Sequence, residues 1–321
     1  MEQVVWGIMG STAWADTMFG PAIQGASNAR LHAVLSSSQA NADAFCAKHS
    51  VECGYSNLEA FLADDEIEAI WIATPQNLHA EQTIAALEHG KHVLCEKTMA
   101  VTADECVLMI HAAERTGNLL SIGYHMRHHP LHQELQQDWN NGQFGTPIYA
   151  RTQIYFPYGE APTTWRAKKE TSGGWAINDV GTHGIDLLRW FLGDAAAVNG
   201  ELSSLRFGLE TDDHAVVTIR FQNGAVGVAD ASTAVGAPAP RLELYGSEGY
   251  CILDGTLFGG GGTVTQSRAG ADAVVSEAPM APLYQNQAEA FSRAVRGEEE
   301  LFVSAEDGLE NVKIIEQARG W

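Results

Sequence analysis

Over residues 1–123, short apolar runs alternate with segments of helical pattern, and this rhythm strongly constrains the fold. The apolar runs lie near 3–9, 31–35, 68–73, 92–95 and 119–123, and the helical patterns near 13–26, 40–49, 78–89 and 102–116. Strands separated by helices of this length pair in parallel through right-handed crossovers. We therefore predict a doubly wound, Rossmann-type α/β sheet over residues 1–123.

The turn after the first apolar run contains Gly7 and Gly10, followed by Ser11, Thr12 and Ala13. Glycine in such a turn lets backbone N–H groups approach a pyrophosphate, which the N-terminus of the next helix favours electrostatically. The usual glycine fingerprint is incomplete, because Thr12 or Ala13 stands at its last position. The hydroxyls of Ser11 and Thr12 can donate to phosphate instead, so the turn still predicts a dinucleotide site.

The second apolar run ends in Ser36, Ser37 and Ser38, and no carboxylate follows until Asp43. An NAD enzyme usually places Asp or Glu here to bind the ribose 2′-hydroxyl. Three serines tolerate a 2′-phosphate, so we expect NADP, with NAD as the alternative, although Asn41 stands where a basic residue would support NADP. The competing interpretation is that the serines only form a turn.

From about residue 124 the pattern changes to strands without intervening helices. Strand-like runs lie at 147–157, 197–208, 213–222, 225–234, 240–246 and 249–253, and helical patterns close the chain at 283–296 and 304–319. Gln222-Asn223-Gly224 is a hairpin signal, whereas the glycine run 259–262 is expected to be a loose turn. With 321 residues the chain is long enough for two domains, and we predict an antiparallel α+β domain over 124–321.

The stretch 173–186 carries the strongest chemical signal of the second region. If a helix begins near Asp179, then His183 lies one turn later and Asp186 follows on the same side. An imidazole between two carboxylates has a raised pKa and a defined tautomer, which suits a general acid or base. The alternative is a solvated helix face.

Lys97 follows the apolar run 92–95, and the segment Thr74–His79 follows the run 68–73. Ligands of open parallel sheets bind outside the carboxyl ends of the strands. A partly desolvated lysine there can polarise a carbonyl or exchange a proton. The alternative is an ordinary surface lysine.

Four histidines, at 125, 128, 129 and 132, have spacings that suit one helical face and hence a metal site. Pro130 interrupts the first turn, and no carboxylate or cysteine is interleaved before Glu134. We therefore expect no metal, and we interpret Arg127 as a cofactor or substrate contact.

The formal net charge of −21 disfavours nucleic acid and anionic lipid as partners. No apolar segment approaches the roughly 20 residues of a membrane span, and no basic leader precedes the first apolar run. The five cysteines form no Cys-x-x-Cys pair, which is typical of reduced thiols in a cytoplasmic protein.

Taken together, these stretches resemble the Gfo/Idh/MocA oxidoreductase family. The resemblance rests on the turn 7–15, the segment 74–79, Cys95-Glu96-Lys97, the segment 124–127 and Asp179-x-x-x-His183. It implies an active-site triad of Lys97, Asp179 and His183. It also implies a large open sheet in the second domain, one face of which serves subunit contacts, so a homo-oligomer, dimer or tetramer, is expected.

The residues expected to contact the cofactor come from these arguments and from the resemblance. They are Gly7, Gly10, Ser11, Thr12, Ala13, Trp14, Ser36, Ser37, Thr74, Pro75, Asn77, His79, Glu96, Lys97, Gly123, Arg127, Trp165, Arg166 and Tyr284. The substrate is expected against Tyr155, Tyr158, Trp165, Arg166, Asp179 and His183. The aromatic residues of this set suit a polyhydroxylated pocket, and the alternative is that they pack a domain junction.

Three positions depart from the family pattern. Thr98 replaces the proline after Glu-Lys, Asn41 replaces an arginine near the 2′-phosphate, and Gly173-Gly174 shortens a triple glycine. The first departure puts the backbone behind Lys97 in question, and the second weakens selectivity for NADP.

The resulting hypothesis is reversible hydride transfer between nicotinamide and a carbon of a sugar, anhydrosugar or polyol that bears a hydroxyl or carbonyl. His183 exchanges the proton with the substrate oxygen, Asp179 sets its tautomer and Lys97 stabilises negative charge, or Lys97 is itself the proton donor. The alternatives are a non-catalytic dinucleotide or sugar sensor, and a glycoside or diol dehydrogenase with a tightly held cofactor.

Overall fold

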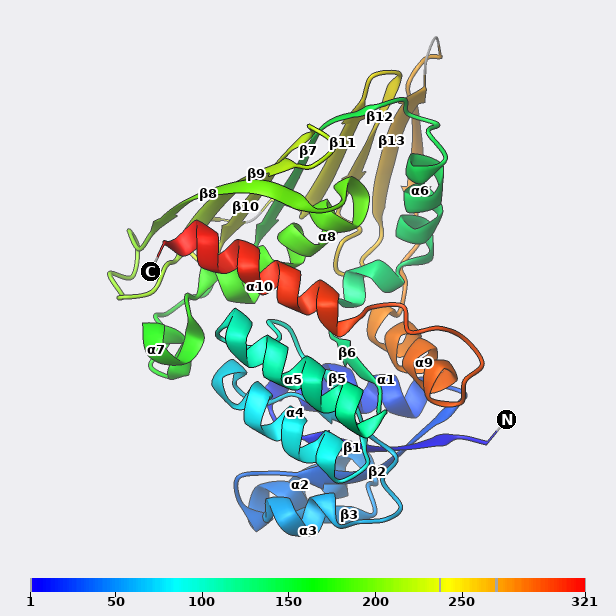
Figure 1. The fold of residues 1–321 in the computed structure, drawn as a ribbon, viewed down its shortest axis with the longest axis vertical. Helices are drawn as coiled ribbons and strands as arrows, with labels where there is room; N and C mark the ends of the chain where they lie inside the picture. The colour runs from blue at the N-terminus through cyan, green and yellow to red at the C-terminus, as the bar shows by residue number, and fades with distance from the viewer. Residues whose placement is uncertain (1, 237, 269–270, 321) are drawn as a thin grey trace. The chain divides into compact units, whose positions relative to one another are not determined.

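A computed structural model describes residues 2–236, 238–268 and 271–320 (Figure 1). Its internal contacts divide the chain into two compact units. Unit 1 comprises Met1–His125 and Tyr284–Glu310, and unit 2 comprises Met126–Leu283 and Asn311–Trp321. The predicted boundary at 123/124 lies two residues before the division at 125/126, and the segment Tyr284–Glu310, predicted in the second domain, belongs to unit 1.

Unit 1 contains a six-stranded parallel sheet with strand order β3-β2-β1-β4-β5-β6. Its strands are β1 (Val4–Met9), β2 (Ala29–Leu35), β3 (Cys53–Tyr55), β4 (Ala69–Ile72), β5 (His92–Cys95) and β6 (Leu120–Ile122). The predicted Rossmann-type sheet is therefore confirmed. Only β3 lacks a sequence prediction, since its three residues contain a glycine and no apolar run.

The helices of unit 1 are η1 (Ala15–Phe19), α1 (Gly20–Gly25), α2 (Gln39–His49), α3 (Leu58–Leu62), η2 (Gln76–Leu78), α4 (His79–Glu88), α5 (Ala103–Thr116) and α9 (Leu283–Val295). Helix α5 shows how the sequence sets its ends: Thr102 and Glu105 form a capping box, and Gly117 ends the helix with a left-handed backbone. Trp6 of β1 packs against Trp71 of β4 and Phe291 of α9. Helix α9 therefore belongs to the core of this unit.

Unit 2 contains an eight-stranded sheet with strand order β14-β13-β12-β11-β7-β10-β9-β8. The strands are β7 (Pro147–Tyr155), β8 (Ala195–Ser203), β9 (His214–Phe221), β10 (Val226–Ser232), β11 (Arg241–Gly246), β12 (Gly249–Asp254), β13 (Gly262–Arg268) and β14 (Val274–Ala278). Every neighbouring pair is antiparallel except β7 and β10, so the predicted mainly antiparallel sheet is confirmed.

Strands β13 and β14 extend beyond the sequence prediction. The polar segment Thr263–Arg268 lacks the apolar alternation that marks a half-buried strand. Four of the five residues of β14 are exposed. Neither strand therefore left a clear periodic signal, and Gly262, expected in a loose turn, begins β13.

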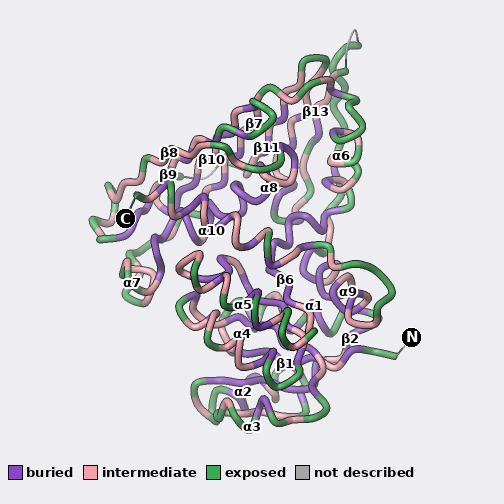
Figure 2. The backbone as a smooth tube through the Cα atoms, in the orientation of Figure 1, coloured by how far each residue is buried: buried purple, intermediate pink, exposed green. Residues whose placement is uncertain are grey.

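The helices of unit 2 are η3 (His125–His128), α6 (Pro130–Asn140), η4 (Trp165–Ala167), α7 (Lys169–Ser172), η5 (Ile177–Gly181), α8 (Thr182–Leu192) and the last turns of α10 (Ala305–Arg319). Helix α8 lies against β7 and β10, and nine of its eleven residues are buried. Figure 2 shows this burial as purple along the helix. Gly184 allows this approach, because a Cβ there would lie 2.3 Å from Thr152 Oγ1. Helix α8 therefore stands at the centre of the core of unit 2.

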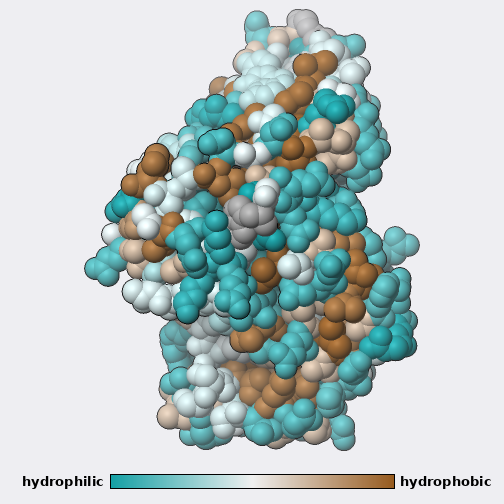
Figure 3. Space-filling model, turned by 60° about the vertical axis from the view of Figure 1, so that its left-hand side comes forward, coloured by the Kyte–Doolittle hydropathy of each residue, from teal (hydrophilic) through white to brown (hydrophobic). Residues whose placement is uncertain are grey.

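The surface view in Figure 3 shows mostly hydrophilic side chains, with hydrophobic ones in small groups between them. None of the described helices is long and apolar enough to cross a membrane.

Candidate active site

Four strand ends of unit 1 lie in register at one edge of the sheet. Met9 pairs with Ile72, Ile72 with Cys95 and Cys95 with Ile122. The residues that follow these strands therefore share one edge, at the point between β1 and β4 where the strand order reverses. Open parallel sheets bind dinucleotides at such a point.

The turn after β1 requires glycine at position 10. The φ angle of Gly10 is +105°, and a Cβ there would lie 2.9 Å from Thr74 Cγ2. Ser11 Oγ lies 2.5 Å from Ser36 Oγ, so this turn meets the end of β2. The open glycine turn and the paired hydroxyls fit the phosphates and ribose of a dinucleotide.

The other predicted cofactor residues near this turn either pack or bond within unit 1 or are exposed. Gly7 lies inside β1, where a Cβ would come 2.7 Å from the ring of Phe61. Thr12 Oγ1 accepts a hydrogen bond from the Ala15 N–H at 3.2 Å, and Ala13 and Ser37 are exposed. Ser38 caps α2, which agrees with the turn-forming interpretation for that serine.

Trp14 and Tyr284 meet although 270 residues separate them. Trp14 Nε1 donates to the Tyr284 hydroxyl at 3.0 Å. The ring of Tyr284 stacks on that of His125, with centroids 4.2 Å apart. Helix α9 makes this contact possible by returning to unit 1, and burial raises the pKa of Tyr284.

Glu96 follows β5 and is 8% exposed. Its Oε1 accepts a hydrogen bond from Trp71 Nε1 at 3.1 Å, and its Oε2 accepts one from the Lys97 N–H at 3.3 Å. A Cβ on Gly123 would lie 2.7 Å from Oε1, so only glycine leaves room for this carboxyl group. Burial raises the pKa of Glu96 to about 7.

His79 joins the segment after β4 to the residues after Lys97. Its Nδ1 lies 3.0 Å from the Thr98 carbonyl oxygen, and its Nε2 lies 2.9 Å from that of Thr74. The ring is fully buried, and desolvation lowers its pKa. Lys97 itself is partly exposed, and the Lys97–Thr98 peptide bond is cis.

Thr74, Pro75 and Asn77 complete the predicted cofactor set after β4. Thr74 Oγ1 donates to Gln82 Oε1 at 2.5 Å, and Pro75 precedes the short helix η2. Asn77 is exposed.

In unit 2, Asp212 binds the backbone at the start of η5, just after the two glycines. Asp212 Oδ1 accepts from the Trp175 N–H at 2.8 Å, and Oδ2 accepts from the Ile177 N–H at 2.7 Å. Gly174 has a φ of +124°, and a Cβ there would lie 2.7 Å from Asp212 Oδ1. Burial raises the pKa of Asp212 to about 6. This residue has no sequence motif and was not predicted, although it determines how the segment enters the helix.

Asp179 pairs with Arg166. Arg166 Nε donates to Asp179 Oδ2 at 2.5 Å, and the side chains are 32% and 16% exposed. The guanidinium also lies over the ring of Trp165, 4.4 Å from its centroid. Burial, followed by the charge of Asp179, raises the pKa of Tyr158. Arg166 therefore binds this carboxylate directly, Trp165 contacts Arg166, and Tyr158 lies within reach of the Asp179 charge.

His183 is the second residue of α8 and is 4% exposed. The predicted helix over this stretch is present, with the π-helical turn η5 holding Asp179 and α8 holding His183. The ring of Phe258 meets the imidazole edge-on, with centroids 6.0 Å apart and an interplanar angle of 82°. Phe258 was not among the predicted residues.

Asp186, the second carboxylate of the motif, is bound to Arg127. Arg127 donates from Nε and Nη2 to the two carboxylate oxygens at 2.9 and 2.6 Å, and the side chains are 5% and 1% exposed. Asn311 Nδ2 adds a third hydrogen bond at 2.9 Å. This geometry supports a structural role for Arg127, and its predicted contact with cofactor or substrate stays a prediction.

The remaining aromatic candidates have partners within unit 2. Tyr155 donates its hydroxyl proton to Asp230 Oδ2 at 2.8 Å. Tyr158 packs edge-on against Trp175, with centroids 5.2 Å apart.

Of the four neighbouring histidines, two form structural contacts that explain them without a metal. The rings of His129 and His132 stack with centroids 4.4 Å apart. His132 lies between the Met126 carbonyl and the Thr256 hydroxyl, at 2.9 and 3.0 Å. Burial lowers the pKa of His132 to about 3, so its ring is neutral.

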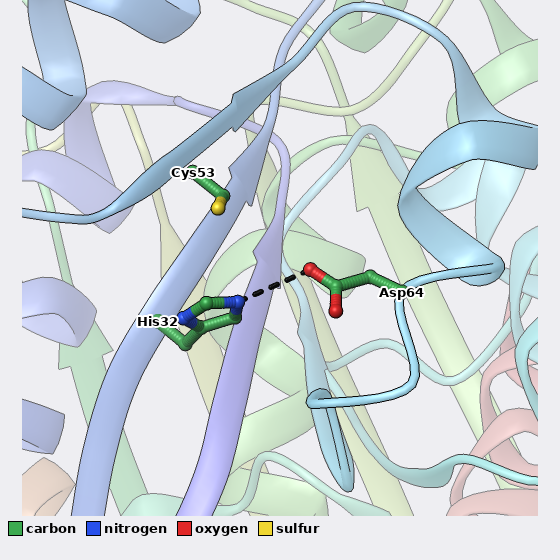
Figure 4. Close-up of side chains that lie close together, drawn as sticks. All are labelled: His32, Cys53 and Asp64. Carbon is green, nitrogen blue, oxygen red and sulfur yellow. Dashed lines mark hydrogen bonds and ion pairs between the residues drawn. The ribbon is translucent and has the colours of Figure 1, made fainter.

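Among the described residues, metal-like spacing occurs in two groups that share His32, on β2 of unit 1. One group adds Cys53 and Asp64, shown in Figure 4, and the other adds Glu52 and Glu66. His32 Nδ1 lies 3.0 Å from Glu52, and Nε2 lies 3.1 Å from Asp64. The carboxylates also receive bonds from Arg30 and Tyr55. We interpret the cluster as a set of hydrogen bonds and ion pairs that joins β2, β3 and the turn after α3.

Two family descriptions match the chain. Residues 4–124 match the oxidoreductase family with an NAD-binding Rossmann fold, and residues 132–252 match the GFO/IDH/MocA C-terminal domain. The chain therefore belongs to the Gfo/Idh/MocA family of oxidoreductases.

Known proteins resemble the whole chain. The 1,5-anhydro-D-fructose reductase of Ensifer adhaerens is 29% identical over 313 residues, which cover 95% of this chain and 92% of that protein. A D-xylose 1-dehydrogenase (NADP(+)) of Haloferax volcanii is 27% identical over 322 residues, or 98% of this chain and 95% of that one. The fold is also that of a levoglucosan dehydrogenase in complex with NADH and levoglucosan, with a TM-score of 0.89, 23% identity and coverage of 99% and 97%.

Proposed function

We propose that this oxidoreductase interconverts a hydroxyl and a carbonyl group on a sugar, anhydrosugar or polyol, with NADP as the preferred cofactor and NAD as the alternative. The observation that carries the proposal is the segment Asp179–His183 at the start of the buried helix α8. Relatives named for anhydrofructose, xylose and levoglucosan support the substrate class.

The dinucleotide, when bound, supplies the hydride chemistry. The edge of the sheet in unit 1 offers it a glycine turn at Gly10, the hydroxyls of Ser11 and Ser36, and the Trp14–Tyr284 pair. The remaining cofactor residues predicted from the sequence stay part of this proposal. No carboxylate follows β2 until Asp43, so none stands where an NAD enzyme usually binds the ribose 2′-hydroxyl, and this supports NADP.

His183 exchanges the proton with the substrate oxygen in this proposal. Asp179 sets the tautomer of His183, and Arg166 holds the Asp179 carboxylate in place at 2.5 Å. Lys97 stabilises the negative charge on the substrate oxygen or donates the proton itself. Tyr155, Tyr158 and Trp165 supply hydroxyl and ring contacts to the sugar.

The decisive experiment is a panel of cyclic sugars, inositols and open-chain polyols, followed by reduced-nicotinamide absorbance with NADP and with NAD. The variants Lys97→Met and His183→Ala should each lower kcat by about 10²-fold or more. Near-normal turnover in both variants would contradict the assignment. No turnover with any compound would favour a sensor, and nicotinamide absorbance that survives dialysis would favour a tightly held cofactor.

We also propose a homo-oligomer formed through the open face of the sheet in unit 2. Tyr245 stacks between Tyr149 and Tyr250 on that sheet, with centroids 5.9 and 6.1 Å apart. Light scattering after size-exclusion chromatography tests this, with Tyr245→Glu expected to shift the mass to that of one chain.

A cytoplasmic location is the final part of the proposal. All five cysteines are free thiols, and three of them are buried. Such thiols persist in a reducing compartment. Fractionation of cells that produce the protein tests this location.

A further inference from the structure

The loop between β12 and β13 carries a phenylalanine whose exposure contrasts with the burial of its neighbours. Phe258 is 39% exposed, whereas Thr256 and Leu257 are both fully buried. Single exposed apolar side chains are common in folded proteins, so the exposure of Phe258 is informative only together with the buried residues that anchor it. The loop therefore holds one aromatic ring outward from an anchored base.

Hydrogen bonds on both sides fix the backbone of this loop. The Gly255 N–H donates to the Pro240 carbonyl at 2.9 Å, and the Gly259 N–H closes a turn on the Thr256 carbonyl at 3.0 Å. The Ala281 N–H then donates to the Gly259 carbonyl at 3.0 Å. Gly259 is required here, since its φ is +78° and a Cβ would lie 2.4 Å from the Ala281 oxygen.

A buried histidine anchors the start of the same turn. The neutral ring of His132 lies 3.0 Å from the Thr256 hydroxyl and 2.9 Å from the Met126 carbonyl. One ring nitrogen donates and the other accepts, so the Thr256 side chain is held to α6. The position of Phe258 is therefore set by packing and hydrogen bonds in advance of any ligand.

The ring of Phe258 meets the ring of His183, the residue proposed for proton transfer, at 6.0 Å and 82°. A substrate oxygen that exchanges a proton with His183 lies within hydrogen-bond reach of its ring. Because Phe258 borders the same imidazole, its ring is placed to contact the carbons next to that oxygen. A cyclic sugar presents a face of C–H groups to such a ring, whereas an open-chain polyol has no fixed apolar face.

We propose that Phe258 determines specificity by packing against the C–H face of a cyclic sugar or anhydrosugar bound at His183. The inference rests on the proposed function and narrows its substrate class from polyols in general to ring compounds. Loss of an apolar contact of this size in a binding pocket costs about tenfold or more in affinity.

The test compares Phe258→Ala with the wild type on pyranoses, inositols, sorbitol and xylitol. We expect KM for the cyclic compounds to rise about tenfold with kcat within a factor of about two, and KM for open-chain polyols to stay unchanged. Phe258→Tyr should retain most of the affinity, since it keeps the ring. Phe302→Ala is the matched control, because Phe302 is 40% exposed and lies in unit 1.

Two failures are distinguishable. If the wild type turns over cyclic sugars and Phe258→Ala keeps the same KM for them, the role of Phe258 is contradicted and the proposed function stands. If the wild type, with NADP present, neither turns over nor binds any of these compounds by calorimetry, the proposed function fails and the inference fails with it.

Discussion

Asp179 and Asp186 lie seven residues apart on one helical segment, and each pairs with an arginine from another element. The surroundings of the two pairs differ. Asp186 and Arg127 form two parallel hydrogen bonds with side chains 1% and 5% exposed. Asp179 and Arg166 share one hydrogen bond, with side chains 16% and 32% exposed. The first pair is closed to water, whereas water reaches both side chains of the second. Burial therefore separates a carboxylate that supports the fold from one suited to chemistry.

The largest effect is expected at the buried pair. Asp186→Ala should lower the free energy of unfolding by about 3–5 kcal/mol, because it leaves the Arg127 charge buried without its carboxylate. Urea denaturation measures this. The double variant Arg127→Met/Asp186→Leu should recover much of the loss, since it removes both charges. A loss below about 1 kcal/mol in Asp186→Ala would show that the two pairs do not differ as described.

Glu96 is also a buried carboxyl group, but its side-chain hydrogen-bond donor is the Trp71 indole, whereas Asp186 has the Arg127 guanidinium. Its pKa is raised to about 7 in the folded protein, against 4.5 for the free group. The folded state therefore keeps a proton that the unfolded state releases, so this contribution to stability is lost as the pH rises from 4.5 to about 7. The loss is about 3 kcal/mol. Asp212, whose pKa is raised to about 6, adds a slope of the same sign at lower pH. Glu96→Gln should therefore flatten the pH dependence of unfolding most clearly between pH 6 and 7, and an unchanged slope in that interval would exclude Glu96 as its source.

At the partly exposed pair, activity and stability should separate. Asp179→Asn should lower kcat by about 10²-fold if the carboxylate supports proton transfer at His183. The free energy of unfolding should change by less than about 1 kcal/mol, as for other exposed pairs. Steady-state kinetics and urea denaturation of the same preparation test both. A large loss of stability with little loss of turnover would reverse the roles given to the two aspartates.

The smallest effect is expected from Arg166→Lys. A lysine keeps the positive charge near Asp179 but loses the planar group that lies over Trp165. We expect kcat/KM to fall about tenfold, with Arg151→Lys, at the sheet of unit 2, as a control of the same chemistry. Equal values for both variants would remove Arg166 from the site.

The sequence predicted those strands and helices that are determined by residues close together in the chain. Strands such as β4, with all four residues buried, are continuous apolar runs, and helix α5 begins with a recognisable capping box. The segment holding Asp179 and His183 was found because spacing on a helix brings side chains together. The same spacing could not show which aspartate was buried, since that depends on Arg127 and Asn311 from other elements.

Residues that act through long-range contacts escaped prediction. Asp212 holds the entry to η5 from 35 residues away, and its sequence context is an ordinary loop. Phe258 lies in a glycine-rich loop that had the pattern of a loose turn. In both cases the position of the residue depends on contacts with segments far away in the sequence. The pattern of apolar and polar residues around it does not reveal such contacts.

Helix α9 packs in unit 1, although all strands of unit 2 lie between it and the first sheet in the sequence. Trp6 Nε1 donates to Ser292 Oγ at 3.1 Å, and Arg296 forms an ion pair with Glu68 at 2.6 Å. The aromatic side of the first sheet is therefore completed only by a helix that follows β1 by most of the described sequence. Residues 1–124 alone lack the Phe291 and Ser292 partners of Trp6. We therefore expect this piece to expose apolar surface and to aggregate more readily than the whole chain.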